Sequence, residues 1–95
     1  MKKTITFSNN TAVLERTGST ATIVITTIPE NTPFPTEIAQ LADRLNEFDF
    51  IYVMQIFPRR GKIVFTVDKA APNADVINVV CDCITCVYNT DTVVK

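Results

Sequence analysis

The sequence predicts an α+β protein built as a two-layer sandwich, in which an antiparallel sheet carries two helices on one face. Two apolar runs, residues 50–57 and 62–68, flank a short basic turn at 58–61, and this pattern is typical of a β-hairpin. Residues 35–48 instead repeat their apolar side chains at helical spacing. Threonine recurs along the whole chain and favours strands, because its branched Cβ restricts the side chain.

Length and charge indicate a single, nearly neutral domain. The 95 residues suffice for one hydrophobic core, so we expect one domain over 1–95, with a hairpin extension at 1–19 and the main fold at 20–95. Nine Lys and Arg against ten Asp and Glu give a net charge of −1, which provides no overall attraction to nucleic acid or lipid. No signal peptide or membrane span is evident, so we expect a cytoplasmic protein without membrane contact.

Three strands are expected before the first helix. Residues 4–7 and 12–15 are short β-like runs around the turn-forming residues 8–10, and they predict an N-terminal hairpin. Residues 21–28 are rich in β-branched side chains and apolar on both faces, as in an interior strand. A rigid, proline-containing loop is predicted at 30–35.

The first helix is predicted at about 35–48. Its apolar side chains recur at steps of three and four, which places them on one face: Ile38, Leu41, Leu45 and Phe48. Glu37, near the expected start, complements the positive end of the helix dipole.

Alternation along the central hairpin assigns a face to each of its residues. If Phe57 and Lys62 are the last paired residues beside the turn, one face is almost purely apolar and should lie under the helices. This expected inner face comprises Phe50, Tyr52, Met54, Ile56, Ile63, Phe65 and Val67. The other face, which is expected to be open, comprises Ile51, Val53, Gln55, Phe57, Lys62, Val64, Thr66 and Asp68.

Residues 73–88 combine β-branched side chains, which favour a strand, with a helical period of polar and apolar stripes. The period predicts a helix at about 72–87, followed by a last strand at 90–94. After the N-terminal hairpin the order is then β-α-β-β-α-β, the split β-α-β arrangement of ferredoxin-like folds.

The segment 21–80 resembles an RNA-recognition motif. Residues 23–29 (IVITTIP) stand where that family has its first-strand hexapeptide, and residues 60–67 (RGKIVFTV) stand where it has its third-strand octapeptide. The family's base-stacking aromatic positions correspond here to Val24, Lys62 and Val64. The resemblance therefore implies the topology, and it does not imply binding on the usual aromatic platform.

The hairpin turn is the candidate site for nucleic acid. Phe57, Arg59, Arg60 and Lys62 have the chemistry to stack a base and contact phosphates. The alternative is a solvated hairpin turn whose charges serve solubility alone.

The cysteines predict no metal site. Cys81, Cys83 and Cys86 do not converge on a helix, and the chain has no histidine to complete a zinc site. We expect them to be buried apolar residues in a reducing compartment. No catalytic pair, glycine-rich phosphate loop or nucleophile motif is present, so no enzyme activity, cofactor or small-molecule substrate is expected.

The expected open face leaves apolar side chains uncovered: Ile51, Val53, Phe57 and Val64. The N-terminal hairpin, a second copy of the chain or another protein would cover them. The sequence thus predicts a non-enzymatic interaction module that self-associates or docks a protein partner, with a composition common among viral structural and accessory proteins. The alternative is a single-stranded RNA- or DNA-binding domain that uses the hairpin turn.

Overall fold

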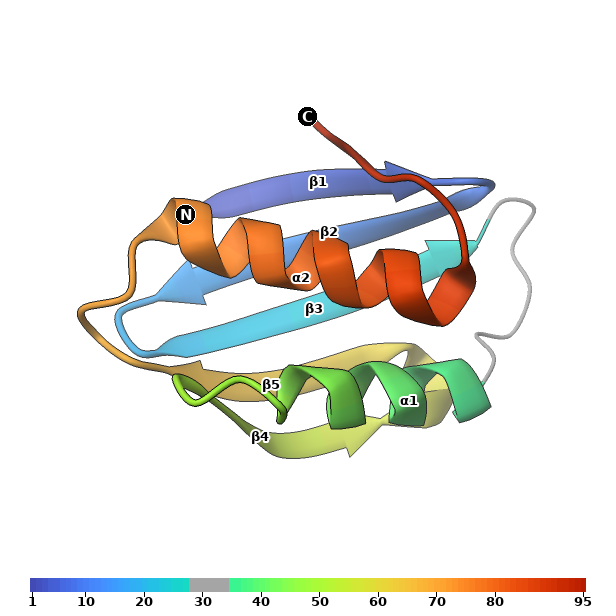
Figure 1. Ribbon diagram of the computed structural model, residues 1–95. Helices are drawn as coiled ribbons and strands as arrows, with labels where there is room; N and C mark the ends of the chain where they lie inside the picture. Colours follow the sequence, from blue (N-terminus) through green and yellow to red (C-terminus); the bar gives the residue numbers. More distant parts are fainter. Residues whose placement is uncertain (28–34) are drawn as a thin grey trace.

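The computed structural model describes residues 1–27 and 35–95, in which a six-stranded sheet carries two α-helices on one face (Figure 1). The predicted α+β class is confirmed, and the predicted loop at 30–35 lies almost entirely outside the described residues. The elements are β1 (Lys2–Phe7), β2 (Asn10–Thr17), β3 (Thr20–Thr27), α1 (Pro35–Leu45), β4 (Ile51–Phe57), the 3₁₀ turn η1 (Pro58–Arg60), β5 (Lys62–Val67), α2 (Asn73–Tyr88) and β6 (Val93–Val94).

The strands lie in the order β4-β5-β3-β2-β1-β6, and all neighbours are antiparallel. β3 and β4, on either side of α1 in the chain, have β5 between them, as a split β-α-β arrangement requires. The second half differs from the prediction, because β5 and β6, which flank α2, are separated by β3, β2 and β1. The complete strand order expected for a ferredoxin-like fold is therefore not the order found.

The N-terminal hairpin occupies the place expected for the last strand. A two-residue turn at 18–19 joins β2 to β3, so β2 pairs with β3 along its whole length. Ala12 and Leu14 of β2 are completely buried in the core. The hairpin is thus part of the main sheet and does not cover the open face, and β6 is left at the far edge with only residues 93–94 paired to β1.

Both predicted helices are present. α1 ends at Leu45, earlier than predicted, and Phe48 packs against the core from the turn that follows. In α2 the helical period outweighs the β propensity of the residues, because the side chains of Val76, Val80 and Ile84 form one face of the helix and are completely buried. Burial of this stripe against the sheet provides the free energy that local propensity lacks.

A β-bulge in β4 changes which residues of the central hairpin face the helices. The register beside the turn is as predicted: Phe57↔Lys62, Ile56↔Ile63 and Gln55↔Val64. The register then shifts between Val53 and Gln55, so Met54 has no partner on β5. Ile51 and Val53 therefore pack on the helix side, whereas Tyr52 and Met54 are 67% and 59% exposed.

The predicted inner face of the hairpin is correct on β5 and partly wrong on β4. Ile63, Phe65 and Val67 are buried as predicted, and Ile56 packs against the core. Tyr52 and Met54 were predicted to face inward and do not, because one extra residue reverses the alternation beyond it.

Candidate functional site

The sheet face opposite the helices, here called the open face, is covered mainly by threonine and valine. Three rows can be followed across the paired strands: Thr17, Thr20, Thr66 and Tyr52; Lys2, Glu15, Thr22, Val64 and Gln55; and Thr4, Val13, Val24, Lys62 and Phe57. The valines of these rows are all half-buried, because neighbouring β-branched side chains cover one another. The open face is therefore less apolar than the sequence predicted.

Phe57, Arg59, Arg60 and Lys62, here called the basic tip, come together at the turn that joins β4 to β5. Phe57 and Lys62 are directly paired, so their side chains lie side by side. The Lys62 Nζ lies 5.8 Å and the Arg60 guanidinium carbon 6.0 Å from the centre of the Phe57 ring. Both separations are within the range of cation–π attraction.

The backbone holds the basic tip in place. Residues 58–60 form the 3₁₀ turn η1, which ends at Gly61 in the left-handed region with φ of 63°. The Gly61 N–H donates to the Pro58 carbonyl oxygen at 3.2 Å, and the Gly61 carbonyl oxygen accepts from the Ile25 N–H at 2.8 Å. These bonds join the turn to the interior strand β3.

A hollow of about 520 Å³ lies beside the basic tip and is lined by Ile56, Phe57, Pro58, Arg59 and Arg60. Arg59 and Arg60 are exposed to solvent. The hollow combines an aromatic ring with two guanidinium groups, which is the chemistry that stacks a base and pairs with phosphate.

Only part of the predicted protein-docking set lies on the open face. Phe57 and Val64 are there, whereas Ile51 and Val53 lie on the helix side. Tyr52, which the prediction placed in the core, joins them on the open face across from Thr66. No pattern in the sequence marks the bulge, so alternation alone does not find this aromatic ring.

Charge is unevenly distributed over the molecule. The basic tip has Lys62 with Arg59 and Arg60, and on the open face farther along the sheet Lys2 is paired to Glu15 at 3.7 Å. The helical layer at 36–49 and 73–88 is acidic, with six carboxylates against Arg44: Glu37, Asp43, Glu47, Asp49, Asp75 and Asp82. The net charge of −1 conceals this separation.

The three cysteines of α2 differ in exposure, and only the buried one has a perturbed pKa. Cys83 is buried, Cys81 is half-buried and Cys86 is exposed, so the predicted burial holds fully only for Cys83. Burial, and then the negative charges of Cys86, Asp82 and Glu47, raise the pKa of the Cys83 thiol to about 12. Near neutral pH Cys83 is therefore a thiol, which is a poor nucleophile and metal ligand. Within residues 1–27 and 35–95, no three metal-binding side chains converge.

Arg16 is a buried charge that the sequence prediction missed. Its guanidinium donates to the Gly18, Asp68, Lys69 and Ala71 carbonyl oxygens and to Asn73 Oδ1. All three of its nitrogens are thereby used, so Arg16 fastens the β5–α2 connection to the β2–β3 turn and is not offered to a ligand. The signal was present, since Arg16 follows Ala12 and Leu14 on the inward-facing positions of β2.

Comparison with protein-family models, curated proteins and solved structures finds no match for this chain. Neither α-helix in the described part of the chain has the length and apolar composition needed to cross a membrane.

Proposed function

We propose that the protein is a non-enzymatic binding module that holds single-stranded nucleic acid at the β4–β5 end of its open face. The observation that carries this proposal is the basic tip, in which a phenylalanine ring lies within 6.0 Å of two cations. Among the described residues, no Asp or Glu forms an ion pair with Arg59, Arg60 or Lys62. A polyanion fits this end of the sheet and is repelled by the acidic helical layer.

The ring and the cations of the tip have separate roles in this proposal. A base stacks on the Phe57 ring, while Arg59, Arg60 and Lys62 contact the phosphates on either side. Tyr52, exposed on the same face of β4, offers a second ring for a base farther along the strand. Both rings lie on β4, unlike the first- and third-strand aromatics of the RNA-recognition motif that residues 21–80 resemble.

Fluorescence anisotropy of a short labelled oligo(dT) or oligo(U) tests this function. Three cations predict a slope of log K against log salt of about −2, since single strands give about −0.7 for each phosphate contacted. Phe57→Ala should weaken binding about tenfold, because base stacking contributes about 1–3 kcal/mol. Arg59→Ala/Arg60→Ala should also flatten the salt dependence.

The matched control is Lys69→Ala/Lys95→Ala, which removes two positive charges from exposed residues outside the basic tip. It should bind nearly as well as the wild type at each salt concentration. Equal weakening by the tip variant and by this control would mean that attraction is not localised, and the proposal would fail.

Docking of a protein partner on the open face is a second candidate. The exposure of Tyr52 and Met54, at 67% and 59%, favours it, because large apolar side chains so exposed commonly mark contact surfaces. Light scattering of the wild type and of Tyr52→Ser/Met54→Ser measures self-association through this surface. A wild type that stays monomeric at every concentration would eliminate self-association there.

A further inference from the structure

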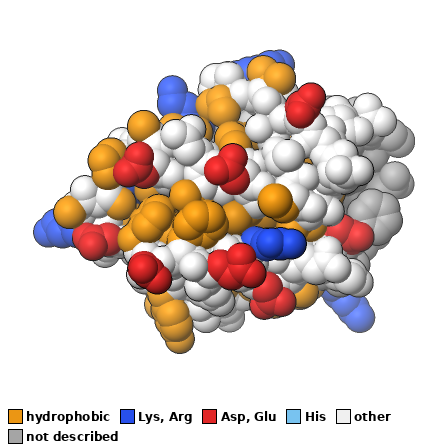
Figure 2. All heavy atoms as spheres, in the orientation of Figure 1, with side chains coloured by type: hydrophobic (Ala, Val, Ile, Leu, Met, Phe, Trp, Pro, Cys, Tyr) orange, Lys and Arg blue, Asp and Glu red, His pale blue; other side chains and the backbone are white. Residues whose placement is uncertain are grey.

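The groove between α1 and α2, here called the seam, combines apolar and negatively charged side chains, whereas the basic tip combines an apolar ring with positive charges. It is lined by Arg44, Glu47, Phe48, Asp82, Cys83 and Cys86. A larger hollow of about 410 Å³ continues it past Asp43 and Val87. Figure 2 shows hydrophobic side chains exposed along this seam, with acidic side chains on both sides of it.

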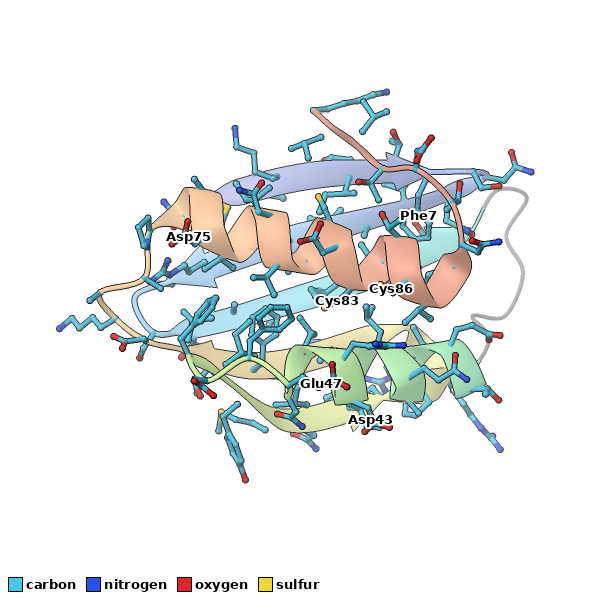
Figure 3. The ribbon with its side chains drawn as sticks, in the orientation of Figure 1. Phe7, Asp43, Glu47, Asp75, Cys83 and Cys86 are labelled. Carbon is cyan, nitrogen blue, oxygen red and sulfur yellow. The ribbon has the colours of Figure 1, made fainter. Side chains whose placement is uncertain are left out.

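The floor of the seam is apolar and its rim is negative. Cys83 is 3% exposed, and Phe48 packs against the core beside it. Figure 3 places Cys83 and Cys86 on the side of α2 that faces α1, with Glu47 on α1's side of the seam. Asp43, Glu47 and Asp82 contribute three negative charges to the two hollows, and Arg44, 3.9 Å from Glu47, contributes the one positive charge.

The basic tip is an apolar group bordered by positive charge, the reverse of the seam. Phe57 and Lys62 lie on the open face and point away from the helices, and Arg59 and Arg60 belong to the turn η1; none of these four residues lines the seam of its own molecule. The pairing of Phe57 with Lys62 and the bond from Ile25 to Gly61 hold the tip there. Contact between tip and seam therefore requires two molecules.

We propose that the seam receives the basic tip of a second copy of this chain. Phe57 and Pro58 pack on the apolar floor, and Arg59 and Arg60 face the carboxylates of the rim. The charge complementarity of two surfaces on one chain selects this occupant, because every copy supplies both halves of the contact. Since the two halves are different surfaces, the contact is heterologous, and it builds a ring or an open filament rather than a two-fold dimer.

Association is expected to be weak and dependent on salt, because the contact is small and its charges are exposed. Sedimentation of the full chain under reducing conditions should show a mass that rises with concentration in low salt. The mass should fall toward that of the monomer in about 0.5 M salt. A wild type that remains monomeric at the highest concentration in low salt would overturn the proposal.

Two neutralised variants separate the halves of the contact. Arg59→Gln/Arg60→Gln disables the tip and leaves the seam, whereas Asp43→Asn/Glu47→Gln disables the seam and leaves the tip. Each should be monomeric alone. An equimolar mixture should form a one-to-one complex and grow no further, because only one tip and one seam remain to pair. All four side chains are exposed, so both variants should keep the circular dichroism spectrum of the wild type.

The seam variant also distinguishes this inference from nucleic-acid binding. Asp43→Asn/Glu47→Gln should lose self-association and bind oligonucleotide as the wild type does, while the tip variant should lose both. If the seam variant associates like the wild type, or if the mixture yields no complex, the seam does not receive the tip. That result would leave the proposed nucleic-acid binding unaffected.

Discussion

Replacing Arg16 tests how the β5–α2 connection is held against the sheet. Arg16 is 9% exposed, and its guanidinium donates to four backbone carbonyl oxygens and to the Asn73 side chain. Arg16→Ala removes all of these donors at once. The Lys69 and Ala71 carbonyl oxygens then depend on water, whereas the Asp68 carbonyl oxygen still accepts from the Ala71 N–H at 2.9 Å, and the loop loses its attachment to the turn at 18–19.

The expected cost follows from the quality of these bonds. Hydrogen bonds from a charged donor contribute about 1.5–3 kcal/mol each, but their contributions overlap when one side chain makes them all. The donations to Gly18 at 2.9 Å and to Ala71 are short, whereas the others lie between 3.2 and 3.4 Å and end on exposed residues that water can reach. We therefore expect Arg16→Ala to lower the free energy of unfolding by about 3 kcal/mol.

Urea denaturation followed by circular dichroism measures this loss. With a urea dependence of about 1–1.5 kcal/mol/M, the midpoint should fall by about 2–3 M. Arg16→Lys should recover less than half of the loss, because one ammonium group does not reproduce a planar fork of donors. The control is Arg44→Ala, an exposed arginine with one ion pair at 3.9 Å, which should change stability by less than about 0.5 kcal/mol. A loss below about 1 kcal/mol for Arg16→Ala would refute the reasoning.

Two further predictions concern the bulge and pH. Deleting Met54 should leave the fold intact, because the alternation of β4 is regular without it. The urea midpoint should stay within about 1 M of the wild type. Deleting Val64 from β5 should unfold the protein, because it would reverse the alternation of a strand that is already regular. Burial raises the pKa of Cys83 from its ordinary 9.0, and that of Tyr88 from 10.0, to about 12. The folded state therefore binds these protons more tightly, so stability should fall as pH rises from about 9 to about 12, and Cys83→Ala should make the fall shallower; the same slope in both proteins would contradict this.

Local pattern predicted the helices and the inner face of β5 because each depends on a period within one segment. Ile38, Leu41 and Leu45 are completely buried on α1, and Val76 and Val80 are completely buried on α2. A helical stripe is a property of consecutive residues, and either helix has only one face that can cover the sheet. The same holds for β5, whose alternation runs without interruption.

The candidate site was predicted in part. Phe57 and Lys62 meet at the end of the hairpin as the turn between them required. The exposed ring of Tyr52 was missed, because a bulge is defined by how two strands pair and not by the composition of one of them. The burial of Arg16 follows the alternation of β2, but its hydrogen-bonding role was missed because most of its partners are more than 50 residues away in the chain.

By itself the sequence determined the α+β class, the two helices, the strands that flank the basic turn and the cations of that turn. The tertiary structure decided which strand lies beside β3 and which residues of β4 face outward. The physical reason is that hydrophobic periods and turns depend on consecutive residues, whereas the order of strands in a sheet depends on which of several possible pairings is the most stable. The two-residue turn at 18–19 determines the pairing of β2, because strands joined by so short a turn pair with each other as a hairpin.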